Sequence, residues 1–282
     1  MNWRLLRDGA ASGAWNMAVD EALLLAQLDE STLDAPPEPI LRFYDWNPTC
    51  LSLGRLQKID AKYFERADGD IIRRPTGGRA VWHQHEITYC AVLRAEWLPV
   101  TSTSVVGSYR WLSEGLLSGL QTLGIDARLP DCGQSTWMQR EKSGNCFESA
   151  AQCDAVVDNR KLIGAAQCRK SLDGRTAIMQ HGSLLLDIDE DAWKQAMQAI
   201  GQDGATMKQV VSLRNLGVAV SSEDVIAALI KGLTHRRDIS CVGADLNPLE
   251  QRIAQRLHRQ KYLSAQWNRY GRAAFTDVSE AR

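Results

Sequence analysis

Short runs of alternating apolar and polar residues fill the first two thirds of the chain and predict β-strands. One early segment departs from this pattern, because the apolar positions of residues 14–28 recur at helical spacing behind Ser12, a residue type that favours a helix N-cap. A second amphipathic helix is predicted over residues 102–123, and Gly124 follows where helices commonly end. The predicted strands cover residues 40–46, 50–53, 70–73, 80–83, 87–93, 154–157, 161–165 and 176–186.

Helical spacing replaces this alternation after residue 187. The three helices predicted there cover residues 190–200, 222–235 and 248–260. Ser221 or Ser222 is suited to cap the second, and Asn247 followed by Pro248 is suited to begin the third. Strands first and helices last indicate an α+β architecture rather than a doubly wound parallel sheet. The same change allows a helical C-terminal subdomain over residues 190–282.

Charge and composition narrow the range of functions. The chain has 33 basic and 34 acidic residues, a net charge of −1, so we expect no nucleic-acid partner. No apolar run approaches the ~20 residues of a membrane helix, and the N-terminus lacks the apolar core of a signal peptide, so we expect a cytoplasmic protein with no membrane partner. The seven cysteines include no C-x-x-C pair, which predicts reduced thiols and no thiolate zinc site.

The densest concentration of functional residue types lies in residues 73–83. Gly77 and Gly78 allow close approach of a ligand to the backbone, whose N–H groups can hold a carboxylate, a thioester carbonyl or a phosphate. Three arginines add positive potential: Arg73, Arg74 and Arg79. An ordinary Gly-Gly hairpin with solvated arginines explains the same residues equally well as a ligand-binding turn. His83 and His85 form an H-x-H pair, for which strand residues on alternating faces are a better explanation than a metal site.

Cys146 is the best candidate for a nucleophile. It follows Ser143-Gly144-Asn145 in a polar loop, whereas Cys90 lies within an apolar strand. Lys161 is 15 positions further on, and two short strands could bring it back to the thiol. A nearby ammonium lowers the pKa of a thiol because it stabilises the thiolate. Taken alone, these residues favour the alternative that Cys146 is structural and Lys161 is solvated.

Four segments in this order resemble the biotin/lipoate protein ligase catalytic superfamily and, within it, the cysteine-dependent octanoyltransferases of the LipM type. They are residues 3–24, 73–83, 145–167 and 180–185, with a weaker match over 261–268. The resemblance implies one catalytic domain over residues 1–282, with mixed or antiparallel β-sheets flanked by helices.

The resemblance also implies a reaction without a cofactor or metal. Cys146 would accept an octanoyl group from acyl carrier protein and pass it to a lysine of a lipoyl domain, such as that of the glycine-cleavage H protein. Lys161 would lower the pKa of the Cys146 thiol and orient the carbonyl. The implied substrate-binding residues are Arg74, Thr76, Gly77, Gly78, Arg79, His83, Gly164, Ala165, Gln167 and His181.

Three other functions stay open at this point. An ATP-dependent lipoate ligase resembles this chain, but such ligases have a third glycine where Arg79 stands and lack a cysteine matching Cys146. An amidotransferase between lipoyl domains would use the same residues. A non-catalytic protein that binds lipoyl domains is disfavoured by Cys146 and Lys161.

Overall fold

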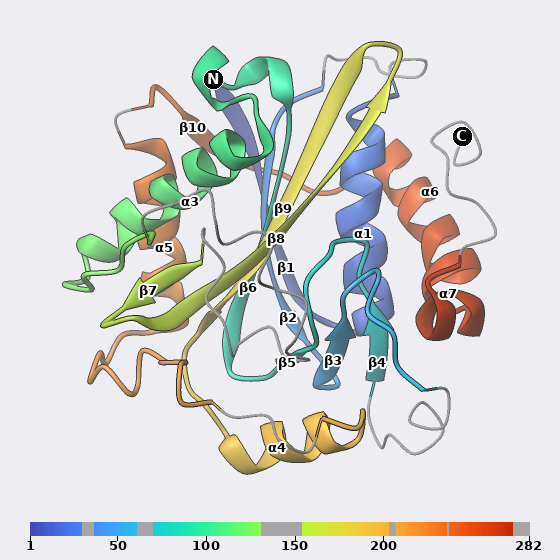
Figure 1. The fold of residues 1–282 in the computed structure, drawn as a ribbon. Coiled ribbons are helices and arrows are strands. Elements are labelled where there is room, and N and C mark those ends of the chain that lie inside the picture. The colour runs from blue at the N-terminus through green and yellow to red at the C-terminus, as the bar shows by residue number, and fades with distance from the viewer. Residues whose placement is uncertain (30–36, 61–69, 131–153, 203–206, 236, 273–282) are drawn as a thin grey trace.

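The computed structural model describes residues 1–29, 37–60, 70–130, 154–202, 207–235 and 237–272. Cys146, the predicted nucleophile, lies outside these residues. Two sheets and the helices around them make up the fold (Figure 1).

The larger sheet has seven strands in the order β10-β1-β2-β6-β9-β8-β7. Its strands are β1 (Asn2–Ala11), β2 (Ile40–Trp46), β6 (Glu86–Arg94), β7 (Ala155–Val157), β8 (Arg160–Leu172), β9 (Arg175–Leu185) and β10 (Ser240–Gly243). Strand β1 is parallel to both β10 and β2, whereas the pairs from β2 to β7 are antiparallel. The sheet is therefore mixed, and long β8 and β9 form a hairpin that crosses the molecule.

The smaller sheet has the order β4-β3-β5 and consists of β3 (Cys50–Leu53), β4 (Asp70–Arg73) and β5 (Val81–His83). Cys50 and Ile72 of this sheet share one hydrophobic core with α1 (Gly13–Ala26) and with Val92 and Met179 of the larger sheet. Helix α1 thus lies in the core between several elements, which explains why nearly every one of its side chains is buried.

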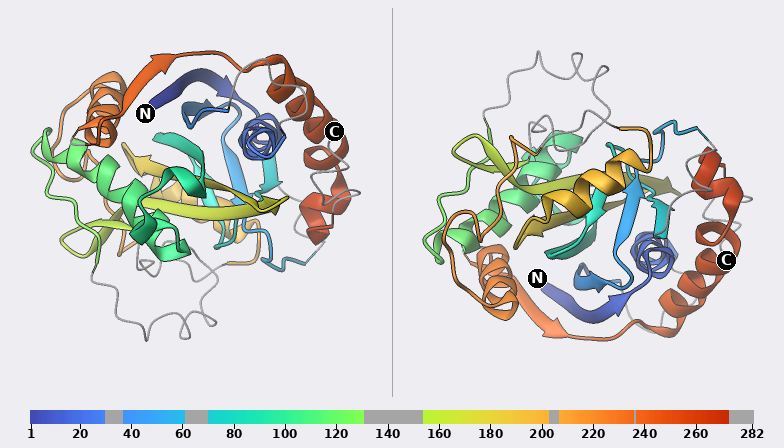
Figure 2. Two further views of the ribbon diagram at one scale, coloured as in Figure 1. Left: turned by 90° about the horizontal axis from the view of Figure 1, so that it is seen from above. Right: turned by 90° about the horizontal axis from the view of Figure 1, so that it is seen from below.

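Helices cover both faces of the larger sheet (Figure 2). On one face α3 (Val105–Gln121) packs with α5 (Ser222–Thr234) over a core that includes β6 and β9. On the other face α1 packs with α6 (Pro248–Leu257), which a turn of π-helix (His258–Tyr262) joins to α7 (Ala265–Tyr270). Helix α4 (Glu190–Gln198) places Trp193 and Met197 against Leu51 and Leu53 of the smaller sheet.

The predicted α+β architecture and mixed sheets are confirmed. The predicted caps are also confirmed, since the Ser12 side chain accepts from Trp15 N, and Ser221 and Asn247 each complete a capping box. The predicted concentration of helices in the last third did not include the strand β10. Three of the four β10 residues are exposed, so this strand has no apolar alternation that a sequence pattern could reveal.

The elements after residue 190 pack on different parts of the molecule. Strand β10 extends the larger sheet, α5 packs on α3, and α6 packs on α1. The division of the chain into domains stays a prediction. Within the described residues, no helix is both long and apolar enough to cross a bilayer.

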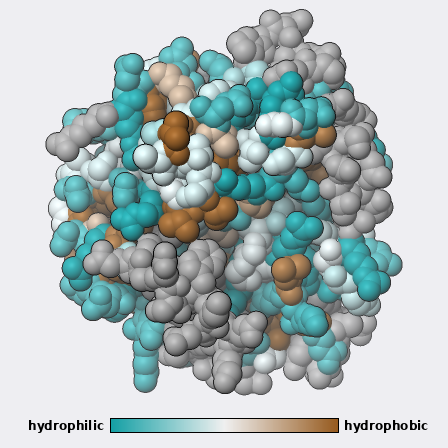
Figure 3. Space-filling view, turned by 45° about the horizontal axis from the view of Figure 1, so that its top comes forward, coloured by the Kyte–Doolittle hydropathy of each residue, from teal (hydrophilic) through white to brown (hydrophobic). Residues whose placement is uncertain are grey.

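The described surface is mainly polar on the face shown in Figure 3, where apolar side chains form small groups between hydrophilic ones. The most exposed large apolar side chains are Leu56, which lies in the connection after β3, and Val100, which begins a short 3-10 helix (Val100–Ser102). The apolar side chains of the regular elements are thus largely turned inward, as burial of apolar area favours.

Helices α3 and α5 approach closely at two glycines, and this contact generates the first prediction. A Cβ atom added to Gly119 would overlap the Ala228 carbonyl oxygen, and one added to Gly232 would overlap the Gly119 nitrogen. We expect Gly119→Ala to lower the free energy of unfolding by about 1–3 kcal/mol, as overpacking does. Urea denaturation would measure this. Gly243→Ala is the control, because a Cβ there meets nothing within 4 Å, and an equal loss in both variants would contradict the explanation.

Candidate active site

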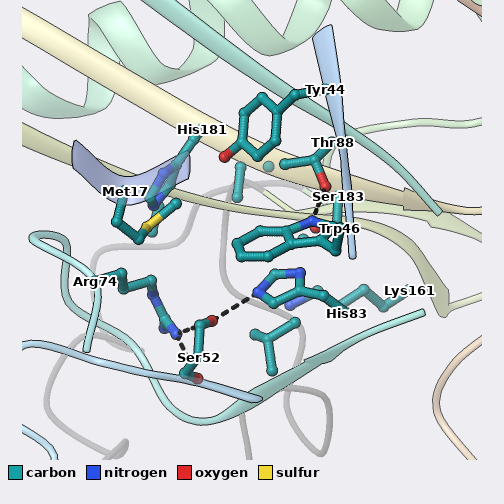
Figure 4. A pocket seen from close by; sticks show the side chains of 15 residues that line it. Met17, Tyr44, Trp46, Ser52, Arg74, His83, Thr88, Lys161, His181 and Ser183 are labelled. Atoms are coloured by element: carbon teal, nitrogen blue, oxygen red, sulfur yellow. Dashed lines mark hydrogen bonds between the residues drawn. The ribbon is translucent and has the colours of Figure 1, made fainter. Parts of the chain in front are cut away.

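A partly open slot lies between the two sheets and the start of α1 (Figure 4). The larger sheet contributes residues of β2, β6, β8 and β9, the smaller sheet contributes residues of β3 and β5, and α1 contributes Met17. One wall consists of small residues of the β8–β9 hairpin, namely Gly164, Ala165, Ala166, Gly182 and Ser183. Small side chains leave room for a ligand directly against the strands.

One polar network beside the slot centres on the buried carboxylate of Asp20 on α1. Its Oδ1 accepts from Arg42 Nη1 at 2.7 Å, and its Oδ2 accepts from the Tyr44 hydroxyl at 2.8 Å. His181 Nδ1 lies 3.0 Å from the same Oδ2, and its Nε2 lies 2.7 Å from Thr76 Oγ1. The network therefore runs from the helix through two strands of the larger sheet to the loop after β4.

The protonation states in this network follow from burial and charge. Burial alone raises the pKa of Asp20, but the hydrogen bond from His181 and the charge of Arg42 outweigh it and bring that pKa below its ordinary value. Burial lowers the pKa of His181, despite the opposing hydrogen bond and charge of Asp20. At neutral pH an ionised Asp20 can only accept, so neutral His181 donates from Nδ1 and its Nε2 accepts from the Thr76 hydroxyl.

A second network centres on Glu86 at the start of β6. Its Oε1 accepts from Thr88 Oγ1 at 2.6 Å and from Ser183 Oγ at 2.7 Å, and it lies 2.7 Å from His83 Nδ1. The other nitrogen of His83, Nε2, lies 2.7 Å from the Ser52 hydroxyl.

The indole of Trp46 completes this side of the slot. It stacks on the His83 ring at 3.9 Å between centroids, and its Nε1 donates to Thr88 Oγ1 at 2.7 Å. Because the polar atoms of these side chains bond to one another, the slot can be lined mainly by carbon although many of its residues are polar. Such a slot suits an unbranched aliphatic group better than a polar one.

The loop after β4 is held by Arg74, which runs along its inner side. Arg74 Nη1 donates to the Ser52 carbonyl at 3.1 Å, and Nη2 donates to the carbonyls of Gly77 at 2.8 Å and Arg79 at 2.7 Å. Gly78 has φ of 92°, and its carbonyl lies where a Cβ on Gly54 would stand. The loop therefore needs glycine at both Gly54 and Gly78.

Arg73 joins this region to the C-terminal segment that matched the family only weakly. Its buried guanidinium donates to the carbonyls of Gly54 and Gln57 and to those of Trp267 and Asn268. Trp267 returns a bond from Nε1 to the Arg73 carbonyl at 2.7 Å. The C-terminal helix thus braces the strand that precedes the loop.

Lys161 lines the slot and forms a buried ion pair. Its Nζ lies 2.8 Å from Asp154 Oδ2, and both side chains are about 2% exposed or less. The second oxygen of Asp154, Oδ1, accepts from Ala165 N at 3.3 Å. Lys161 is therefore held against the slot wall, where an ammonium group can stabilise negative charge on a bound ligand.

The structure brings together part of the predicted site. Arg74, His83, Gly164, Ala165 and His181 line the slot together with Lys161. Thr76 contacts it through His181, whereas Gly77, Gly78 and Arg79 lie in the loop that Arg74 holds. Gln167 lies outside the slot lining and bonds to Ser108 of α3 and Gln180 of β9. Cys146 lies outside the described residues, so its distance from Lys161 stays a prediction.

The histidine pair takes two different environments. Both nitrogens of His83 are engaged by Glu86 and Ser52, whereas His85 is exposed in a turn with φ of 51°. The two rings are separated because β5 ends at His83, so His85 stands beyond the strand, and the strand alternation predicted for the pair does not extend to it. His83 is part of a hydrogen-bonded network.

Two buried thiols in the described residues are poorly suited to act as nucleophiles. Cys50 and Cys90 are free and fully buried, and burial raises the pKa of each above its ordinary value. Neither is suited to form a thiolate at neutral pH. This agrees with the preference for a polar-loop cysteine over Cys90.

Sequence reasoning missed the acidic centres of the site, which are Asp20, Glu86 and Asp154. A signal existed for Asp20, because it stands at helical spacing between the apolar residues Met17 and Leu24. Charged residues are almost never fully buried unless they are paired. Glu86 and Asp154 stand at the start of strands, where exposed carboxylates are common, so their positions carry no comparable signal.

The mixed sheet, the smaller sheet and the helices around them form the fold of lipoate protein ligase catalytic domains. Lipoate-protein ligase A bound with ATP superposes with a TM-score of 0.74 at 23% identity, covering 95% of this chain and 99% of that one. The Thermoplasma acidophilum protein Ta0514 with bound lipoic acid gives 0.72 at 22% identity, with coverage of 95% and 100%. At these identities the likeness concerns the fold.

The chain belongs to the lipoyl protein ligase A/B catalytic domain family, whose model matches residues 12–234. Among its relatives, the octanoyltransferase LipM of Kyrpidia tusciae is 38% identical and covers 94% of this chain and 98% of its own length. The octanoyltransferase LipM of Bacillus subtilis is 33% identical, with coverage of 94% and 97%. The resemblance inferred from the four sequence segments is therefore confirmed.

The second prediction concerns the pH dependence of stability. Burial holds the pKa of His181 below the value of about 6.5 in an unfolded chain, so the unfolded chain binds more protons as the pH falls past that value. The contribution of His181 to stability is thus present above pH 6.5 and lost below it. We expect His181→Asn, which does not titrate, to reduce the loss of unfolding free energy between pH 7.5 and 5.5 by on the order of 1 kcal/mol.

Denaturation at the two pH values measures this loss. His85→Asn is the matched control, because His85 is exposed and asparagine tolerates its positive φ. If His181→Asn keeps the full wild-type difference between the two pH values, the assigned protonation state of His181 is wrong.

Proposed function

We propose that this protein is an octanoyltransferase of lipoate biosynthesis, which moves octanoyl from acyl carrier protein to a lysine of a lipoyl domain. The glycine-cleavage H protein is the acceptor that we propose. The slot is the observation that carries the proposal, because it combines carbon-lined walls with the charge of Lys161 at its edge. The full-length relatives named octanoyltransferase LipM support it.

The proposed reaction has two transfer steps. In the first, the Cys146 thiolate forms a bond to the octanoyl carbonyl carbon, the donor C–S bond breaks, and the donor leaves as a thiol after it takes up a proton. In the second, the neutral amine of the acceptor lysine forms the C–N bond, the enzyme C–S bond breaks, and the amine proton is released as the amide forms. A thioester exchange followed by amide formation requires no ATP.

The groups around the slot have separate tasks in this proposal. The alkyl chain lies against Gly164, Ala165 and Ala166 of β8. Lys161 stabilises the negative charge that develops on the carbonyl oxygen in both steps. The Arg74-braced loop closes the slot from the side of the smaller sheet, so that water is kept from the acyl-enzyme.

The third prediction is an acyl-enzyme on Cys146. Incubation with octanoyl-acyl carrier protein should add the mass of one octanoyl group, less one hydrogen, to the intact protein without ATP. Peptide mapping should locate the addition at Cys146. Cys146→Ala should show no addition and no transfer to the glycine-cleavage H protein. Transfer at the wild-type rate by Cys146→Ala would overturn the proposal, and a requirement for ATP would favour a lipoate ligase.

The fourth prediction tests where the acyl chain lies. Ala166 lines the slot opposite His181 in the β8–β9 pairing. In Ala166→Leu, the larger side chain should fill the space of several acyl carbons, and octanoyl transfer should fall by about tenfold or more. Butyryl transfer should fall much less. Initial rates with the two acyl carrier protein thioesters provide the measurement, and an equal loss for both would contradict the placement.

A further inference from the structure

The ion pair of Lys161 and Asp154 is fixed by backbone as well as by charge. The turn between β7 and β8 uses Asp158 and Asn159, both with positive φ of 49° and 61°, which returns the chain so that Lys161 lies beside Asp154. On its other side the Lys161 backbone bonds to Gln209 O at 2.7 Å and accepts from Val211 N at 3.0 Å. Lys161 therefore has little freedom to leave the carboxylate.

The two carboxylate oxygens of Asp154 make contacts that serve different purposes. Its Oδ2 balances the ammonium of Lys161, and its Oδ1 accepts from the Ala165 backbone in the slot wall. One carboxylate thus sets both the charge of Lys161 and its distance from the wall. A buried ammonium without such a counter-ion favours its neutral form, because low-polarity surroundings disfavour charge.

We propose that Asp154 is a positioning residue that holds Lys161 as an ammonium ion against the wall of the acyl slot. The inference rests on the proposed function and specifies the role of Lys161 in it. An ammonium ion has no lone pair with which to accept a proton. Lys161 therefore acts through its positive charge on the thioester and not as a general base.

Other titratable groups lie close enough to matter for a pH-dependent test. Tyr44, Arg74, His83 and His181 line the same slot, and Tyr89 interacts with Asp154 from β6. Arg160 and Lys208 are near Lys161 along the chain and beside its β-bridge to Val210. Variants that alter only Asp154 and Lys161 distinguish the titration of Lys161 from that of these other groups.

The fifth prediction concerns Asp154→Asn, which retains an acceptor for Ala165 N but removes the charge. The rate of octanoylation by octanoyl-acyl carrier protein is followed by intact mass from pH 6 to 9. The ratio of variant to wild-type rate should fall as the pH rises, by about tenfold or more across this range, because Lys161 loses its proton once Asp154 is neutral. A purely structural role would lower the rate by one factor at every pH.

A second comparison introduces Asp154→Asn into the Lys161→Arg variant. Arginine keeps its charge at every pH in this range. Asp154→Asn introduced into Lys161→Arg should therefore leave the shape of the pH profile unchanged. Lys161→Arg alone should keep more activity than Lys161→Gln, a comparison that tests the role of charge even if Asp154→Asn fails to fold.

The pair of Glu21 and Lys261 is the matched control. It is comparably buried, with both side chains 6% exposed and Nζ 2.6 Å from Oε2, but neither residue lines the slot. Glu21→Gln should lose stability and keep the wild-type pH profile. If the ratio of the Asp154→Asn rate to the wild-type rate is constant across the pH range, the inference is wrong but the proposed function is not. The same holds if Glu21→Gln shows the same pH-dependent loss of rate. Absence of octanoylation in the wild-type protein overturns the proposed function and with it the inference.

Discussion

The cost of removing the Asp20 carboxylate from water determines how the site is built. A buried carboxylate is tolerated only where donors surround it, and Arg42, Tyr44 and His181 supply them from two strands. Helix α1 can therefore dock on the larger sheet in one register. Since His181 also bonds to Thr76, the same carboxylate sets the position of the loop that borders the slot. The site is thus an extension of the packing of α1.

The two carboxylate networks explain how a slot lined by many polar residues can suit an alkyl chain. Around Glu86, as around Asp20, hydroxyl and imidazole groups bond to one another, and their carbon atoms remain to face the ligand. The Lys161–Asp154 pair differs from both networks, since it places a charged donor at the wall itself. Polar atoms are thereby concentrated where a carbonyl would lie, and the remaining surface is apolar.

Local patterns predicted much of the fold because they carry strong physical signals. Helical spacing and capping side chains identified α1, α3, α5 and α6, whereas β10 escaped because an exposed edge strand buries few side chains. In the site, glycines and arginines marked the loop after β4. The partners of His83 and Lys161 could not be read from sequence, because Glu86 and Asp154 are set by the register of strands.

The contacts between the two ends of the chain bear on how the protein folds as it is synthesised. Glu21 near the start bonds to Lys261 and Tyr262, about 240 positions later, and Arg4 pairs with Glu250. The Asp20 carboxylate of the emerging apolar helix can pair with Arg42 early, whereas the Glu21 carboxylate lacks its Lys261 ammonium until residue 261 has been synthesised. Such non-local closure slows folding and exposes intermediates to aggregation. Premature termination before residue 261 thus leaves a product that cannot complete its own core.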